Sequence, residues 1–411
     1  MENPKIRFKG FTKDWEQRKL GELSSSFEYG LNASAKEYDG ENKYIRITDI
    51  DDDSREFKQK DITSPDTDLS SAENYRLSEG DILFARTGAS VGKSYIYKAS
   101  DGLVYYAGFL IRARIKPEYN SEFVFQNTLT GDYEKFIKVT SMRSGQPGVN
   151  AQEYSQYQIM VPSKPEQDKI SDCLRNLDNL ITLHQRKCEQ TKNLKKYMLQ
   201  KMFPQNGAKV PEIRFNGFTH DWEQRKLGDD LVSIHTGTNL LGSITNTGMP
   251  LIKMGNIQRG YFDTSKVEFL AENEQPDKAD IVNYGDFFFN TRNTLELVGK
   301  GATWMKNSGE YAFNSNIARF ELRNLDTIFF NYLYNTDYMT KQIHARAMGT
   351  TSVAAIYPRT LDSVEYLAPC MKEQQKIGAY FKQLDHLITL HQRQCDELKK
   401  MKKYMLQNMF I

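Results

Sequence analysis

The stretch A-R-T-G-A-S-V-G-K-S, residues 85–94, combines glycines with a Gly-Lys-Ser triplet, the residue types that surround phosphates in nucleotide-binding loops. Such a loop needs a glycine five residues before the Gly-Lys glycine, so that successive backbone N–H groups close around the phosphates. Position 87 is a threonine, and Gly88 lies one residue too close. The spacing therefore favours a strand, a turn and a second strand over an ATP site.

A second version of this stretch, N-T-R-N-T-L-E-L-V-G-K-G, occupies residues 290–301. It keeps Val-Gly-Lys but has Gly301 where a phosphate-binding loop requires Ser or Thr. A nucleotide site shared by both copies would not survive that change. The arginine, threonine and lysine of these turns are instead groups that can bind a polyanion.

The bulk composition sets few limits on function. The chain has 411 residues, a net charge of +2 and four cysteines, Cys173, Cys188, Cys370 and Cys395. None of the cysteines has metal-ligand spacing, so we expect free thiols in a reducing cytoplasm. No secretory signal opens the sequence and no apolar run reaches transmembrane length. If DNA is the partner, the basic groups that hold it must be local.

The strongest feature is an internal repeat. P-K-I-R-F-K-G-F-T-K-D-W-E-Q-R-K-L-G (4–21) recurs as P-E-I-R-F-N-G-F-T-H-D-W-E-Q-R-K-L-G (211–228). L-D-N-L-I-T-L-H-Q-R (177–186) recurs as L-D-H-L-I-T-L-H-Q-R (384–393). Both blocks return at the same offset of 207 residues. The chain is therefore two similar half-molecules in series.

Between the shared blocks, residues 24–165 and 231–372 have diverged and keep only scattered landmarks. Parts that are nearly identical should meet the same partner or each other, whereas divergent parts held in one frame should meet different targets. A recent duplication alone would not spare two blocks and change what lies between them. The repeat thus predicts two modules of different specificity on a common frame.

Each half ends in a long run with helical periodicity. The first begins near Pro165, a residue favourable in the first turn of a helix, and ends near Phe203, before Pro204. Apolar residues recur at alternating steps of three and four, which is typical of a coiled-coil seam. The predicted seam comprises Leu174, Leu177, Ile181, Met198, Phe381, Leu384, Ile388 and Met405. The two helices are expected to pair antiparallel.

Several polar residues of these helices have two interpretations. His184 and His391 fit the seam better than a metal or proton-transfer site, and Cys188 and Cys395 fit it as small apolar fillers. The basic run Lys192–Tyr197 is typical of a solvated face, and a contact with a partner or with DNA backbone stays open.

Each divergent region mixes short strands with a helix, which predicts an α+β fold. We expect strands at 43–50, 80–85, 94–99 and 109–115, with a helix from Ser121 to about Val139. The second region should match with strands at 250–257, 285–290, 302–306 and 316–322 and a helix near 326–347. The predicted domains are residues 1–165, 166–205, 206–372 and 373–411: module, helix, module, helix.

Groups that can read or hold DNA gather at the predicted strand ends. Arginine and lysine bond guanine edges, asparagine and glutamine bond adenine, and hydroxyls and lysines hold phosphates. The candidates of the first module are Arg46, Thr48, Arg86, Thr87, Lys93, Ser94, Arg143, Ser144, Gln146 and Asn150. Those of the second are Lys253, Asn256, Arg292, Asn293, Thr294, Lys300, Thr350, Thr351 and Ser352.

The duplicated pattern F-x-G-F-T-x-D-W-E-Q-R-K-L-G, G-D-I-L-F-A-R-T-G…V-G-K, V-P…P-E-Q-D-K-I and L-x-x-L-I-T-L-H-Q-R resembles the specificity subunit of type I restriction–modification systems. The likeness covers essentially the whole chain. The second copy departs from the pattern in F-F-F-N-T-R-N-T and A-P-C-M-K-E-Q-Q-K-I, which leaves the expected fold intact.

This resemblance implies two target-recognition domains in pseudo-two-fold repeat, separated by paired helices and each reading one half of a split DNA site. It implies two adenine-N6 methyltransferase subunits docked on the repeated frame, and two translocase–endonuclease subunits that join for restriction. S-adenosylmethionine, ATP and magnesium belong to those partners, so this chain is expected to hold no cofactor or metal and to catalyse nothing. The alternatives are a coiled-coil adaptor that binds only proteins and an enzyme that uses the 85–94 loop for a nucleotide.

Overall fold

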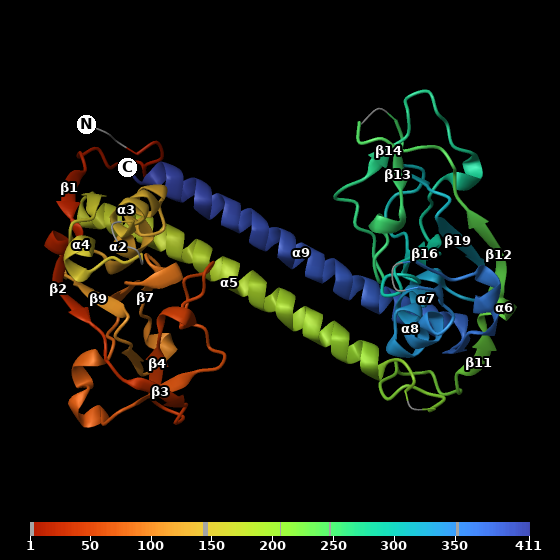
Figure 1. The fold of residues 1–411 in the computed structure, drawn as a ribbon, viewed down its shortest axis with the longest axis horizontal. Helices are drawn as coiled ribbons and strands as arrows, with labels where there is room; N and C mark the ends of the chain where they lie inside the picture. Colours follow the sequence, from red (N-terminus) through yellow and green to blue (C-terminus); the bar gives the residue numbers. More distant parts are fainter. Residues whose placement is uncertain (1–3, 143–146, 206, 246–247, 351–352) are drawn as a thin grey trace. The chain divides into compact units, whose positions relative to one another are not determined.

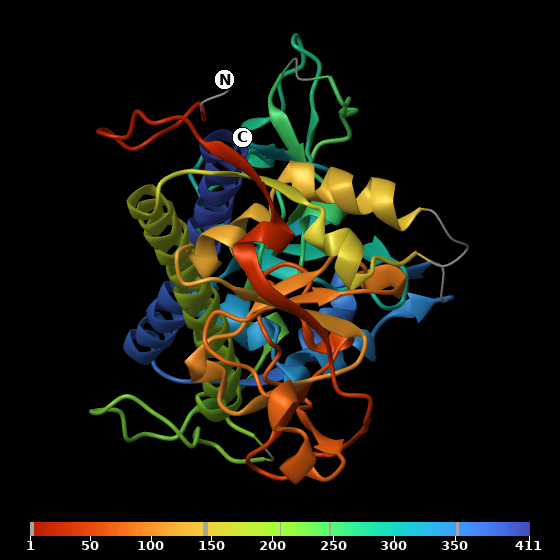
Figure 2. The same cartoon turned by 90° about the vertical axis from the view of Figure 1, so that its left-hand side faces the viewer.

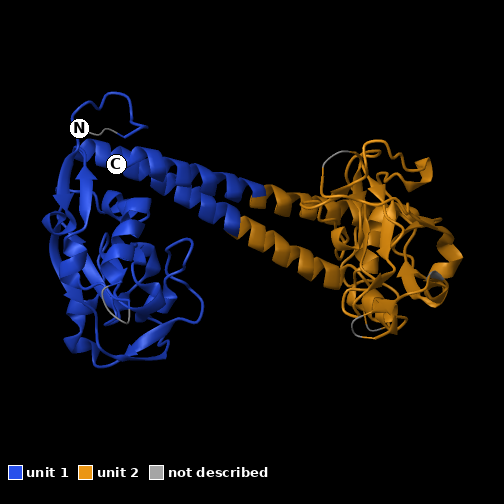
Figure 3. Ribbon diagram, turned by 45° about the horizontal axis from the view of Figure 1, so that its top comes forward, with its two compact units in different colours: residues 1–185, 393–411 blue, residues 186–392 orange. Residues whose placement is uncertain are grey.

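A computed structural model describes residues 4–142, 147–205, 207–245, 248–350 and 353–411. The chain divides into two compact units, one made of residues 1–185 and 393–411 and the other of residues 186–392 (Figure 3). Each unit contains the globular module of one repeat. The two long helices, α5 (Lys164–Lys201) and α9 (Met371–Met409), each contribute residues to both units.

An antiparallel sheet organises the described part of the first module (Figure 1). Its strand order is β2 (Ser24–Tyr29), β9 (Leu110–Ile115), β6 (Ile82–Ala85) and β7 (Ser94–Ile96). Because successive side chains of a strand point to opposite faces, β6 supplies two cores: Phe84 packs into one and Leu83 into the other. The sheet is therefore covered by apolar side chains on both faces.

The helices of the first module are α2 (Ser121–Asn127), α3 (Gly131–Ser141) and the short α4 (Ala151–Ser155); this unit faces the viewer in Figure 2. The single helix predicted from Ser121 to about Val139 is wrong, because the chain leaves the helix after Asn127 and starts another. Thr130 caps the new helix by accepting a hydrogen bond from the Tyr133 N–H. Thr130 thus marks the start of a helix, although in the sequence it looks like an ordinary residue inside one helical pattern.

Shorter elements complete the first module. They are β1 (Glu16–Lys19) with β10 (Gln158–Val161), β3 (Ser34–Glu37) with β5 (Thr63–Asp66), β4 (Lys43–Ile45) with β8 (Val104–Tyr106), and helix α1 (Leu20–Leu23). The strand predicted at 43–50 ends at Ile45, because the chain turns into the 3-10 helix η1 (Ile47–Asp49). β4 and β8 pair in parallel.

The second module repeats this plan. Its main sheet has the order β12 (Leu231–Thr236), β19 (Ile317–Leu322), β15 (Phe287–Asn290) and β17 (Gly301–Thr303). The other elements are β11 (Glu223–Lys226) with β22 (Glu365–Ala368), β14 (Glu268–Phe269), β13 (Pro250–Ile252) and β18 (Ala312–Phe313) in one sheet, and α6 (Leu227–Asp230). The helix predicted near 326–347 is again two helices, α7 (Thr327–Tyr334) and α8 (Asp337–His344), the second capped by Thr336.

The repeated blocks make the same contacts in each unit. Arg7 forms a two-pronged ion pair with Glu166 at the start of α5, and Arg214 forms the same pair with Glu373 at the start of α9; both closest distances are 2.7 Å. All four of these side chains are largely buried. The near-identity of the two sequence blocks is therefore explained by one set of anchoring interactions that is built twice.

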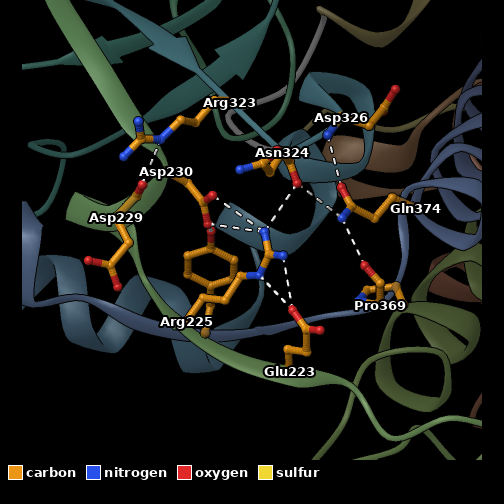
Figure 4. Close-up of polar contacts among 10 residues, drawn as sticks. Glu223, Arg225, Asp229, Asp230, Arg323, Asn324, Asp326, Pro369 and Gln374 are labelled. Atoms are coloured by element: carbon orange, nitrogen blue, oxygen red, sulfur yellow. Dashed lines mark hydrogen bonds and ion pairs between the residues drawn. The ribbon is translucent and has the colours of Figure 1, made fainter.

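Gln374 shows how a long helix is fastened to its module (Figure 4). Its amide oxygen accepts from the Asp326 N–H, and its amide N–H groups donate to the carbonyls of Pro369 and Asn324. Gln167 repeats two of these contacts in the first unit, with the Asn120 N–H and the Pro162 carbonyl. The glutamine of the Glu-Gln pair shared by both copies thus fastens each long helix to its module.

Nearby in the second unit, Arg225 ties the start of the module to the main sheet (Figure 4). Its guanidinium contacts the carboxylates of Glu223 and Asp230 and the carbonyl of Asn324. Asp230 also accepts from the Tyr366 hydroxyl, and burial raises the pKa of that phenol. Asp230 and Tyr366 are buried and Arg225 is partly buried, so the frame itself uses these three groups.

Within each unit the long helices pack antiparallel, as predicted. In the first unit Cys173 lies against Met405 and Asp178 accepts from Lys402 at 2.6 Å. In the second unit Asp385 pairs with Lys195, which is the same ion pair displaced by one repeat. The first lysine of each Lys-Lys-Tyr motif therefore belongs to the helix pairing.

The residues of the predicted seam are buried or partly buried in the structure. Leu174, Leu177, Ile181, Phe381 and Leu384 are buried, and Met198, Ile388 and Met405 are partly buried. Cys188 and Cys395 are buried free thiols, as expected of small fillers.

The C-terminal end of each long helix is inserted into a module core. Phe203 stacks on Phe329 and Phe381 in the second unit, and Phe410 stacks on Phe123 in the first. Beside them the chain makes one backbone hydrogen bond per unit, from Ile6 N–H to the Asn408 carbonyl and from Ile213 N–H to the Lys201 carbonyl, both 2.9 Å. These contacts close each module onto the helix of the other repeat.

Candidate nucleic-acid interface

The segment that follows β6 in the first module is held rigidly. The Arg86 N–H donates to the Phe109 carbonyl at 3.1 Å, and the Arg86 carbonyl accepts from the Val149 N–H at 2.9 Å. Thr87 then forms a β-bridge with Gly148. Three segments that are far apart in the sequence therefore meet at this strand end, and their polar side chains form one surface.

The side chain of Arg86 lies close to two aromatic rings. Its guanidinium carbon is 5.1 Å from the centre of the Tyr29 ring and 5.9 Å from that of Phe109. Both rings are unusually exposed, by 44% for Tyr29 and 58% for Phe109. The Tyr29 hydroxyl accepts from the Ala151 N–H, which fixes that ring to helix α4. The aromatic pair was missed from sequence, since each ring alone looks like an ordinary strand residue.

Asn150 lies at the same strand end, two residues beyond the bridge. Its side-chain oxygen caps α4 by accepting from the Glu153 N–H at 2.9 Å, and the Glu153 carboxylate in turn accepts from the Asn150 N–H. Capping therefore occupies the oxygen of this exposed amide. The candidates Arg143, Ser144 and Gln146 lie outside the described residues, as do Thr351 and Ser352 of the second module.

Arg46 and Lys253 occupy equivalent turns. Each precedes a 3-10 helix whose third residue accepts a hydrogen bond from its backbone N–H: Asp49 for Arg46, and Asn256 of helix η6 (Met254–Asn256) for Lys253. The Arg46 side chain also pairs with Asp49, and Thr48 donates to the same carboxylate. Lys253 instead reaches Glu268 at 2.6 Å. A carboxylate of the protein therefore pairs with each of these two cations.

Asn256 is 7% exposed, because its side chain also donates to the carbonyls of Asp263 and Lys266. Ser94 is 1% exposed and bonds to the Thr128 hydroxyl at 2.6 Å. The structure therefore places these two sequence candidates inside the fold, where they hold loops and strands together. Both were predicted from their residue type, whereas the direction of a side chain is set by the tertiary structure.

The lysines of the two Val-Gly-Lys turns make equivalent connections. Lys93 pairs with Asp52 and Lys300 donates to Gln258 at 2.7 Å, so each ties its turn to the loop that follows the 3-10 helix. The backbone N–H of Gly92 donates to the Ala85 carbonyl and to the Tyr154 hydroxyl. The groups that would surround a phosphate are thus engaged with the protein, and the loop is the strand–turn–strand predicted from its spacing.

In the second module the segment after β15 forms a small ribbon. Its strands are β16 (Arg292–Asn293), β21 (Ala354–Ala355) and β20 (Met348–Gly349). Arg292 pairs with Ala355, the counterpart of the bridge between Thr87 and Gly148. Arg292 and Thr350 are exposed, whereas the Asn293 side chain accepts from the Thr294 N–H. The structure thus brings together Arg292, Asn293, Thr294 and Thr350.

One arginine in each main sheet, buried in the first and partly buried in the second, was missed from sequence. Arg112 on β9 is 1% exposed, donates to the Arg76 carbonyl and lies 3.7 Å from Asp81. Arg319 on β19 contacts Asp286 and the Ile281 carbonyl in the same way. Burial raises the pKa of Asp81 and of Asp286 and lowers that of Arg112 to about 10. These arginines hold the strand ends in place from inside, and alternating Arg residues in F-L-I-R-A-R-I were the available signal.

The described residues contain no group of three or more His, Cys, Asp or Glu side chains that could hold a metal ion. Within the same residues, no helix has the length and apolar content needed to cross a bilayer.

Comparison with known proteins agrees with this architecture. The family model for the type I restriction modification DNA specificity domain matches residues 12–193 and again residues 219–400. The type I restriction enzyme MjaVIII specificity subunit of Methanocaldococcus jannaschii is 23% identical, with 95% of this chain and 91% of the relative covered. The putative MjaX specificity subunit of the same organism is 24% identical over the same shares.

The fold is also similar to a solved one. The crystal structure of the type I restriction–modification S subunit from M. genitalium matches with a TM-score of 0.66 at 12% identity, covering 100% of this chain and 99% of that one. With two complete matches to the family model and two modules on one repeated frame, the chain belongs to the type I restriction–modification DNA specificity family, whose members are non-catalytic DNA-recognition subunits.

Proposed function

We propose that this specificity subunit reads a bipartite, asymmetric DNA site, with one half-site for each module. The observation that carries the proposal is the contrast between the two parts of each repeat. The frame contacts of Arg7 with Glu166 and of Arg214 with Glu373 are the same, whereas the strand-end surfaces differ: Arg86 lies close to two exposed rings in the first module and Arg292 lies on a ribbon in the second. Two different surfaces on equal supports suit two different short sequences.

We further propose that the repeated frame carries two adenine-N6 methyltransferase subunits, and that two translocase–endonuclease subunits join for restriction. Exposed leucines on α5 support a protein partner, since Leu180 and Leu183 are 43% and 41% exposed beside the buried seam. S-adenosylmethionine, ATP and magnesium would be bound by those partners. The assembly would then work in the cytoplasm, where its DNA substrate and ATP are found.

The test is a map of N6-methyladenine in genomic DNA from cells with and without this chain. The proposal expects one split, asymmetric motif to lose methylation when the chain is deleted and to regain it on complementation. A strain with an inactive methyltransferase subunit serves as the control. If complementation restores a continuous motif, or if methylation never depends on the chain while the methyltransferase is active, the proposal is wrong.

The paired helices are proposed to set the gap between the half-sites. Adding one heptad to both α5 and α9 lengthens the pair by about 10 Å, which corresponds to roughly three base pairs. Both half-sites should then be kept while the unread gap changes. An unchanged gap in an active complex would contradict this role.

A further inference from the structure

Within the first recognition surface, one side chain differs from the other arginines around it. Arg46 is paired with Asp49, Arg112 is buried, and Arg114 contacts Asp81. Arg86 instead has its guanidinium close to the rings of Tyr29 and Phe109, and no carboxylate of the described residues pairs with it. Within the described residues, no ion pair therefore keeps its N–H donors from a ligand.

Two aromatic rings limit where the guanidinium can lie. Cation–π contacts with two rings restrict the side chain, and the backbone of Arg86 is held on both sides by Phe109 and Val149. A planar donor fork held in one orientation matches two acceptors on a single edge, which is how arginine bonds the O6 and N7 atoms of guanine. The order that base recognition requires is thus already present in the protein.

The surroundings favour a base over a phosphate. A phosphate site uses free backbone N–H groups and mobile lysines, but here the N–H groups of Arg86 and Gly88 donate to protein carbonyls and Lys93 pairs with Asp52. The exposed neighbours are instead the two aromatic rings, which suit the flat and apolar parts of bases. Each of these three features points away from simple charge neutralisation.

We propose that Arg86, oriented by Tyr29 and Phe109, is the residue of the first module that specifies a guanine by bonding its major-groove edge. This inference rests on the proposed reading of a bipartite site and adds to it the base and the residue that reads it. Tyr29 and Phe109 are positioning residues, since they act through the guanidinium.

The test uses the reconstituted methyltransferase complex with the full chain. Binding is measured at several salt concentrations on the cognate site and on sites with one base changed, together with the methylated motif. In Arg86→Ala, discrimination at one G·C pair of one half-site should fall about 5- to 150-fold, while the other half-site stays intact. Arg86→Lys should lose the same discrimination, because a lysine keeps the charge but not the planar fork.

Two further variants separate base reading from other roles. Phe109→Leu keeps an apolar side chain at this exposed position and should relax the same base pair by a smaller factor. Arg76→Ala removes a surface arginine of the same module that is paired with Glu73, and should leave the motif unchanged. Circular dichroism of each variant confirms folding.

Three outcomes would overturn the proposal. One is equal weakening on every sequence by Arg86→Ala, with a salt slope smaller by about one and recovery by Arg86→Lys, which identifies a phosphate contact. The others are an unchanged motif in both Arg86 variants and relaxation in the half-site of the second module. In all three the wild-type complex still reads a split site, so the proposed function stands; if the wild-type complex reads none, both fail together.

Discussion

The two modules are most alike where they meet the long helices and least alike at the ends of β6 and β15. After β6 the described residues of the first module form a bridge at Thr87 and place Arg86 close to two rings, whereas after β15 the second module has a three-stranded ribbon that carries Arg292. The bridge and the ribbon use equivalent pairing positions. Variation is thus concentrated where side chains face outward, and core packing does not restrict it.

The turns at Arg46 and Lys253 also keep the same backbone while their side chains differ. The backbone N–H of each is bonded by the third residue of the following 3-10 helix, although one acceptor is a carboxylate and the other an amide. The backbone is kept while charge and reach change. The side chains of a recognition surface can therefore change while the backbone fold stays the same.

The largest effect should come from exchanging a whole module. Replacing residues 24–157 with the matching segment of another family member leaves β1, β10 and α5 intact. One half-site of the methylated motif should be replaced completely and the other kept, as read by N6-methyladenine sequencing. A change in both half-sites would show that the modules are not independent.

Gly92 and Gly299 should be equally intolerant of a side chain. Both have positive φ, 84° and 78°, and an added Cβ would lie 2.6 Å from Ile137 or 2.7 Å from Ile343. Gly92→Ala and Gly299→Ala should each lower the free energy of unfolding by about 2–4 kcal/mol, from strain and overpacking together. Urea unfolding measures this.

The control for these glycines is Gly88→Ala, where φ is 70° and nothing lies within 4 Å of the new Cβ. It should cost only about 1 kcal/mol. If Gly92→Ala cost no more than Gly88→Ala, the shared Val-Gly-Lys motif would need a reason other than packing.

The buried ion pairs of the frame should contribute equally to the free energy of unfolding in both units. Glu166→Ala or Glu373→Ala leaves a largely buried arginine without its carboxylate, and each should lower the free energy of unfolding by about 2–3 kcal/mol. Glu16→Ala, which removes an exposed partner of Arg18, should have little effect. Unequal losses of unfolding free energy for Glu166→Ala and Glu373→Ala would show that the two frames are not equivalent.

The smallest effect is expected in the helix pair. Asp178→Asn and Asp385→Asn weaken the ion pairs with Lys402 and Lys195, at about 1 kcal/mol each. The loss should shrink at high salt, because these pairs are only partly buried. A double-mutant cycle of Asp178→Asn with Lys402→Met isolates the pair, and a coupling of zero would assign the helix pairing to apolar contacts alone.

Sequence periodicity predicted the long helices and their seam well, because a coiled-coil seam depends on local spacing that any reader of Leu174, Leu177 and Ile181 can see. It did not predict the pairing of β1 with β10, since Glu16 and Val161 are brought together only by the folded module. The missed helix break at Thr130 had a local signal, a threonine cap, that a helical pattern concealed.

The candidate site was predicted in part. Strand-end reasoning found Arg86 and Arg292, which the structure leaves at the surface or on a strand edge, but it could not tell them from Ser94, whose direction is decided by packing against Thr128. It also overlooked Arg112, because a charge in an apolar strand is normally assigned to the surface. Which loop residues touch bases stays a prediction for the experiments above.

The two backbone hydrogen bonds at the helix ends have a topological consequence. The bond from Ile213 to Lys201 lies beside a continuous stretch of chain, whereas the equivalent bond from Ile6 to Asn408 joins segments at opposite ends of the described sequence. The chain is thus held next to each helix end in the same way, whether or not the two bonded segments are neighbours in sequence. A circular permutant joined near residues 411 and 4 and opened near residue 208 should keep both of these hydrogen bonds and the buried ion pairs of both units.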